Sequence, residues 1–212
     1  MPTVLRAVAA ATAAVAIALP QVAGAAQSAS DLTTRAMQEC DLGQDATSRD
    51  TRKEHFERGE ALATQAVALD DKSAQAHFAI VCNLGEMLRL DGEKITSVFE
   101  LRRLLSEVDR TLQLDPNHVD AMATKGTLLV RLPRVFGGDA KEGERLLREV
   151  VKRDDNAVTS RITLAKTVVQ RGDRNEAIQL AARARQIAEQ QGRADKVAEA
   201  QATLDELGAG TR

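Results

Sequence analysis

The sequence has 212 residues, with 29 Lys and Arg against 31 Asp and Glu and a formal net charge of -2. A balance this close provides no long-range field to attract nucleic acid or an anionic membrane. The chain has no Trp, no Tyr and only four Phe, so it is poor in the ring faces on which bases and sugars stack. Composition therefore argues against nucleic-acid and carbohydrate binding and favours an aliphatic core.

Residues 1–26 have the pattern of a cleavable secretory signal peptide. Arg6 precedes an uncharged run over 7–19, a proline then breaks the helix, and small residues up to Ala25 provide a cleavage site. The run is shorter than the roughly 20 apolar residues of a membrane span, and no cysteine directly follows the cleavage region. We therefore expect export to a bacterial periplasm or to the outside, with no stable membrane anchor after cleavage.

Beyond this segment, apolar residues recur every three or four positions, and no useful stretch alternates at two, which predicts an all-α fold. In chain order the periodicity predicts helices over 32–42, 50–69, 74–90, 93–114, 119–132, 140–153, 158–171, 174–190 and 194–207. Polar or glycine-containing breaks separate the helices within pairs, at 43–48, 91–92, 133–139 and 172–173. Residues 208–212 are expected to form a frayed tail.

Sharp helix-to-helix corners recur at Asp70-Asp71, Asp115-Pro116 and Asp154-Asp155. Pro116 ends the helix that precedes it, and the aspartates are suited to capping the start of the helix that follows. Three such corners indicate an array of helix pairs. The predicted domain covers 27–207 and holds repeats of about 31–73, 74–118, 119–157 and 158–191.

Small residues at regular positions within these repeats resemble the tetratricopeptide repeat (TPR) family. In the fourth repeat, Ala165, Ala177 and Ala184 match the family's eighth, twentieth and twenty-seventh positions, and in the third, Gly126 and Gly143 match the eighth and twentieth. The resemblance implies a right-handed α-solenoid of about four TPR-like helix pairs, closed by a capping helix. The register places inserted residues in the turns within repeats, so we expect the longest repeat to project near 88–99.

The TPR resemblance also implies a concave groove lined by the first helix of each repeat. The candidate binding residues in this groove are Phe78, Cys82, Thr127, Val130, Arg131, Ile162, Lys166 and Gln170. An apolar strip beside Arg131 and Lys166 would suit an extended peptide or a partner helix with one acidic group. The alternative is that Ile162 and Val169 pack against the closing helix instead.

Cys40 and Cys82 fall in the first helices of adjacent repeats. They either form a disulfide in an oxidising compartment or remain two buried free thiols. The histidines have no metal-ligand spacing, and His77 occupies a packing position. No phosphate loop, activated serine or catalytic cysteine context is present. We therefore predict no enzymatic activity, no metal and no cofactor.

The segment 132–139, Leu-Pro-Arg-Val-Phe-Gly-Gly-Asp, also resembles a loop in the helical-repeat accessory components (T-component-like) of bacterial periplasmic TRAP solute transporters. This second resemblance implies a small organic acid bound near Arg131 and Lys166. The first hypothesis is an exported TPR scaffold that binds another protein or peptide through its groove and a projecting edge. The alternative is a periplasmic solute-transporter accessory component.

Overall fold

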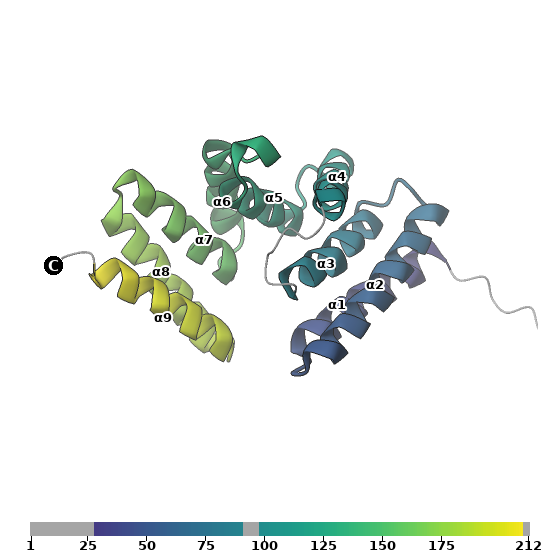
Figure 1. Ribbon diagram of the computed structural model, residues 1–212, viewed down its shortest axis with the longest axis horizontal. Helices are drawn as coiled ribbons and strands as arrows, with labels where there is room; N and C mark the ends of the chain where they lie inside the picture. The colour runs from purple at the N-terminus through teal and green to yellow at the C-terminus, as the bar shows by residue number, and fades with distance from the viewer. Residues whose placement is uncertain (1–27, 91–97, 210–212) are drawn as a thin grey trace, which may run out of the picture.

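The computed structural model describes residues 28–90 and 98–209, and every regular element in these two stretches is a helix. The predicted all-α solenoid is therefore confirmed. The helices follow one another around an arch, with the purple α1 and the yellow α9 at its two ends (Figure 1). The predicted signal peptide 1–26, the break at 91–92 and the helix start at Glu93 lie outside the described residues.

Four helix pairs and a closing helix make up the described chain. The elements are α1 (Ala29–Asp45), α2 (Arg49–Leu69), α3 (Ala74–Leu90), α4 (Val98–Leu114), α5 (Val119–Arg131), the 3-10 turn η1 (Arg134–Phe136), α6 (Ala140–Arg153), α7 (Val158–Val168), the 3-10 turn η2 (Val169–Arg171), α8 (Arg174–Gln190) and α9 (Ala194–Ala209). The predicted bounds of α3, α6 and α8 agree with the structure to the residue. In the described part of the chain, no helix is both long and apolar enough to cross a membrane.

The first helix is longer than predicted. The Ser28 hydroxyl accepts the backbone N–H of Asp31 at 3.0 Å and caps the start of α1. The helix then continues through Gly43, where the sequence predicts a polar break. A β-carbon on Gly43 would overlap the ring of Phe56 on α2. Glycine at this position lets α1 and α2 approach closely, so the predicted break at Gly43 was wrong.

The corners between pairs share one hydrogen-bonding pattern. In each, an aspartate carboxylate accepts the backbone N–H two residues later: Asp70 from Lys72 at 3.0 Å, Asp115 from Asn117 at 2.9 Å and Asp154 from Asn156 at 2.8 Å. Such aspartate turns fix the direction in which the next helix leaves the corner. The aspartates therefore tighten the corners directly after helix ends, whereas the sequence predicts that they cap helix starts.

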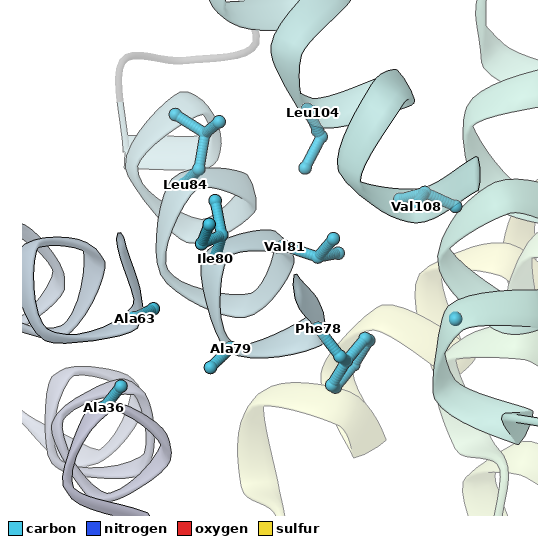
Figure 2. Close-up of a cluster of buried hydrophobic side chains, with 10 residues drawn as sticks. Ala36, Ala63, Phe78, Ala79, Ile80, Val81, Leu84, Leu104 and Val108 are labelled. Carbon is cyan, nitrogen blue, oxygen red and sulfur yellow. The ribbon is translucent and has the colours of Figure 1, made fainter. Parts of the chain in front are cut away.

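Helix α3 lies at the centre of the largest core cluster, between the first helix pair and α4 (Figure 2). Its buried residues pack against alanines of α1 and α2 on one side and aliphatic residues of α4 on the other. The members labelled in the figure are Ala36, Ala63, Phe78, Ala79, Ile80, Val81, Leu84, Leu104 and Val108. Small residues on α1 and α2 bring these helices close to α3.

The two helices of the third pair meet at the glycines predicted for positions eight and twenty. A β-carbon on Gly126 would lie 3.1 Å from the carbonyl oxygen of Gly143, and one on Gly143 would lie 2.8 Å from that of Gly126. Gly143 is also crowded by Val130, 2.7 Å from the same β-carbon position. The helix backbones therefore touch here, as the TPR register predicts.

A buried asparagine joins the first two pairs. The side-chain amide of Asn83 on α3 donates to the carbonyl oxygens of Ala36, at 3.0 Å, and Ala79, at 2.9 Å. A β-carbon on Gly59 of α2 would overlap this side chain. Gly59 thus makes room for Asn83 to reach α1, a contact that repeat register alone does not reveal.

Candidate functional site

The apolar strip predicted along the concave groove is largely part of the core. Phe78 is only 7% exposed, and its ring packs on that of His118, with centroids 4.5 Å apart. The imidazole of His118 also accepts the backbone N–H of Ala121 at 3.3 Å and so caps α5. Phe78 therefore supports the junction of the second and third pairs, and little of its side chain is exposed in the groove.

Helix α9 covers the apolar groove positions of α7 and η2. Ile162 is 1% exposed and belongs to a cluster with Ile187 of α8 and Ala200 of α9. Val169 packs beside the cluster that contains Leu207 of α9. The structure therefore favours the alternative in which these residues pack against the closing helix.

Val130 is the remaining apolar candidate in the groove. It is partly buried, contacts the core cluster of the last repeats and lies against Gly143 within its own pair. Its side chain thus contributes to the packing of α5 on α6. With Phe78 and Ile162 also buried, most of the apolar strip that the TPR resemblance implies is packed within the core.

The two predicted groove cations face a carboxylate of the same chain. Lys166 lies 3.8 Å from Glu199 of α9, and Lys196 lies 2.8 Å from the same group. Burial would raise the pKa of the Glu199 carboxyl, but the hydrogen bond from Lys196 and the charges of Lys196, Lys166 and Arg131 outweigh it and lower the pKa. An organic acid bound at Arg131 and Lys166 would have to compete with Glu199.

Glu199→Gln is expected to lower the melting temperature by about 1–4 °C at pH 7, because partly exposed ion pairs contribute up to about 1 kcal/mol. Since the folded-state pKa of Glu199 is lowered, its stabilisation is present above the unfolded value near 4.5 and is lost as pH falls through the folded value. In thermal melts from pH 7 down to pH 3, the melting temperatures of the wild-type chain and of Glu199→Gln should converge. A difference in melting temperature that stays constant across this pH range would contradict a stabilising role for the ionised Glu199 carboxylate.

A disulfide joins the first helices of the first two pairs. Cys40 on α1 and Cys82 on α3 are bonded, with their Cα atoms 6.2 Å apart. The amide of Gln44 lies 3.4 Å from the Glu86 carboxylate and also contacts both sulfurs. Of the two alternatives that the sequence leaves open, the structure contains the bridge, so Cys82 holds α3 against α1.

The other predicted groove residues are polar or small. Thr127 is half-buried on α5, whereas Arg131 is exposed at the end of α5 and Gln170 is exposed in the middle of η2. Together they present a polar surface without an apolar anchor. Such a surface lacks the buried aromatic or aliphatic contacts that dominate protein-binding energy.

His77, the histidine at a packing position, is almost fully buried at the first corner. Its Nδ1 lies 2.6 Å from the Glu107 carboxylate, and its Nε2 lies 3.1 Å from the carbonyl oxygen of Asp71. A polar hollow of about 630 Å³ opens beside it over α4. No group of three metal-binding side chains occurs in the described residues. His77 therefore ties the first corner to α4.

Five of the seven exposed large apolar side chains of the described residues lie at the turns within helix pairs, which we call the turn edge; the other two are Leu69 and Ile178. The five are Leu42 near the end of α1, Val98 and Phe99 at the start of α4, and Val135 and Phe136 in η1. Phe99 is 77% exposed and Val135 84%. Most of the projection predicted near 88–99 lies outside the described residues. The resemblance of 132–139 to a transporter-component loop does not predict an exposed apolar pair there. The sequence signal for that pair is Val135 and Phe136 between Pro133 and two glycines.

A small pocket lies at the second of these turns. Its volume is about 210 Å³, enough for one or two side chains. The lining residues are Arg49, Lys53, Glu57, Leu84, Met87, Leu88, Leu90 and Glu100. Exposed Phe99 directly precedes Glu100 on its rim. The turn edge thus combines exposed apolar side chains with a recess lined by four aliphatic and four charged residues.

Comparison with known proteins identifies the fold. No protein-family model matches the sequence, and no curated protein sequence matches it either. Among solved structures, the chain is similar to TTC0263, a thermophilic TPR protein of Thermus thermophilus. The alignment spans 84% of this chain and 99% of TTC0263, with 15% sequence identity and a TM-score of 0.53. MamA of Desulfovibrio magneticus RS-1 is 15% identical, and its alignment spans 84% of this chain and 97% of the MamA chain, with a TM-score of 0.48. Yeast Tom70 is 19% identical, and its alignment spans 84% of this chain and 40% of the Tom70 chain, with a TM-score of 0.44. The likeness to TTC0263 shows that the chain has the TPR type of fold, an α-solenoid of helix pairs.

Proposed function

We propose that the chain is an exported scaffold that binds a protein or peptide, mainly through the turn edge. The observation that carries this proposal is the exposure of Phe99 and Val135 at successive turns. A pocket of about 210 Å³, lined by four aliphatic and four charged residues, includes Glu100, the neighbour of Phe99. Apolar anchors and recesses that accept them supply most of the energy of protein binding. The concave groove, polar at Thr127 and Gln170, is the secondary surface in this proposal.

Two features support export. Residues 1–26 have the pattern of a secretory signal, and the Cys40–Cys82 disulfide suits an oxidising compartment such as the periplasm. A secreted or periplasmic chain should begin near Ala26 and contain no free thiol. Intact-mass analysis without reductant would measure both properties.

Site-specific crosslinking tests the binding proposal. A photoreactive amino acid is placed at Phe99 on the turn edge, at Thr127 in the groove, or at Leu69, an exposed apolar residue at the opposite kind of turn. The chain is expressed in an oxidising compartment of its own cells. We expect a protein adduct of defined mass at Phe99, and none at Leu69.

The outcomes separate the two functional hypotheses. An adduct at Thr127 alone would move binding from the turn edge to the groove. No adduct at either position, combined with a rise in melting temperature on adding small carboxylates, would replace the scaffold by a solute-binding component. Ligand stabilisation becomes measurable once the carboxylate concentration exceeds its Kd.

A further inference from the structure

The turn between α5 and α6 is held by its own backbone. We call residues 132–139 the apolar turn. The carbonyl oxygen of Pro133 accepts the N–H of Phe136 at 2.9 Å and that of Gly138 at 3.1 Å, and the N–H of Asp139 donates to Leu129 at 2.9 Å. The turn is therefore fixed to the end of α5.

Two glycines make this conformation specific. Gly137 has a φ of 90°, a left-handed conformation that side chains disfavour. A β-carbon on Gly138 would overlap the carbonyl group of Leu132. Asp139 then closes the turn, because its carboxylate accepts the N–H groups of Lys141 and Glu142, each at 3.1 Å. Few other sequences would hold the backbone in this shape.

This fixed turn presents apolar side chains to solvent. Val135 is 84% exposed and Phe136 41% exposed, on a convex tip. Exposing such residues gains nothing for folding, whereas a rigid presentation reduces the ordering cost of binding. A convex apolar tip fits a concave apolar recess on a partner.

The charges beside the tip define the rim of that recess. Neither the Arg134 guanidinium nor the Lys141 ammonium has an ion-pair partner within residues 28–90 and 98–209, whereas nearby carboxylates are already engaged. Asp139 accepts two backbone N–H groups, and Glu142 pairs with Arg145 at 2.7 Å. Arg134, Lys141 and Arg145 against Asp139 and Glu142 leave a net charge of +1 beside the tip, which is complementary to a carboxylate.

We propose that the apolar turn docks into a partner protein, with Val135 and Phe136 inserted in an apolar recess whose acidic rim pairs with Arg134 and Lys141. This proposal rests on the proposed scaffold function and names the surface and the partner chemistry. A protein partner is favoured over a lipid surface because a fixed backbone matters for a shaped recess. A fluid bilayer accepts apolar side chains from flexible loops equally well, and two such residues bind it only weakly.

The test begins with a photoreactive residue at Val135 in the chain expressed in its own cells. The adduct is identified by mass spectrometry, and its crosslinked peptide is mapped. The captured protein is then purified, and its Kd is measured with the wild-type chain and with Val135→Ser and Arg134→Glu. We expect each substitution to raise the Kd by about tenfold or more, and reversal of the facing partner carboxylate to lysine to restore binding to Arg134→Glu.

Matched controls keep the result specific. Leu69→Ser removes an apolar side chain that is 61% exposed at a corner between pairs, and it should leave the Kd unchanged. Unchanged melting temperatures for all three variants establish that only the surface has been altered.

Three results would overturn the docking proposal. The first is an unchanged Kd for both Val135→Ser and Arg134→Glu, and the second is an adduct at Phe99 or Thr127 with none at Val135. In both, the scaffold function stands and the apolar turn is excluded as its docking site. The third is co-sedimentation with phosphatidylglycerol vesicles that Val135→Ser abolishes, without any protein adduct, which would assign the turn to a membrane. Absence of adducts at every position would instead remove the scaffold function itself.

Discussion

Reduction of the Cys40–Cys82 disulfide is expected to lower the free energy of unfolding by about 4 kcal/mol, which is the loop-entropy value for a closed loop of this length. The bridge spans a sequence separation of 42 residues and ties α1 to α3. For a domain of this size, the loss corresponds to a fall in melting temperature of about 8–16 °C. Thermal melts with and without dithiothreitol measure it.

The double variant Cys40→Ala, Cys82→Ala provides the control for the reductant. Its melting temperature should be low and should not respond to dithiothreitol. A wild-type chain that melts at the same temperature with and without reductant, while its thiols are shown to be freed, would refute a stabilising bridge between the first two pairs.

Gly143→Ala is expected to destabilise the chain by about 1–3 kcal/mol, although alanine is the better helix former. The new β-carbon would lie 2.7 Å from Val130 and 2.8 Å from the backbone oxygen of Gly126. The facing backbone cannot move aside without separating α5 from α6. Chemical denaturation should show a lower midpoint and an unchanged m-value, the slope of the unfolding free energy against denaturant concentration.

The same substitution at Gly85 is the matched control. A β-carbon there would meet only Leu104, at an ordinary 3.8 Å. Gly85→Ala should therefore be neutral or stabilise by up to about 1 kcal/mol. Equal changes in stability at Gly85 and Gly143 would show that helix propensity determines both. Such a result would contradict the close contact between α5 and α6.

The helices could be predicted because their signals are local. Apolar spacing places α3, α6 and α8 to the residue, and the aspartate-containing corners mark where each of the first three pairs ends. Small residues in register also predict the contact between Gly126 and Gly143. These features depend on a few neighbouring residues, so the sequence alone contains them.

The groove could not be predicted in the same way, because exposure depends on which elements lie over a surface. Repeat register gives Ile162 a groove position, but α9 covers it. Phe78 is withdrawn from solvent by the ring of His118, which belongs to the next pair. Register fixes the direction of a side chain on its helix, not what packs against it.

Two features that sequence reasoning missed carry recognisable signals. Asn83 is a polar residue within an otherwise apolar stretch of α3, a pattern typical of a buried hydrogen-bonding side chain. Val135 and Phe136 lie between Pro133 and two glycines, where a turn is expected and apolar residues are not. Apolar residues in a strongly specified turn favour a binding role over a packing role.

The most direct test of the exported scaffold is intact-mass analysis of the tagged chain, isolated from its own cells after mild crosslinking and without reductant. We expect a chain that lacks residues 1–26, has no free thiol and is joined to a second protein of defined mass. A chain that retains residues 1–26 with two free thiols would contradict export. A mature chain that carries only a small acid would contradict the scaffold.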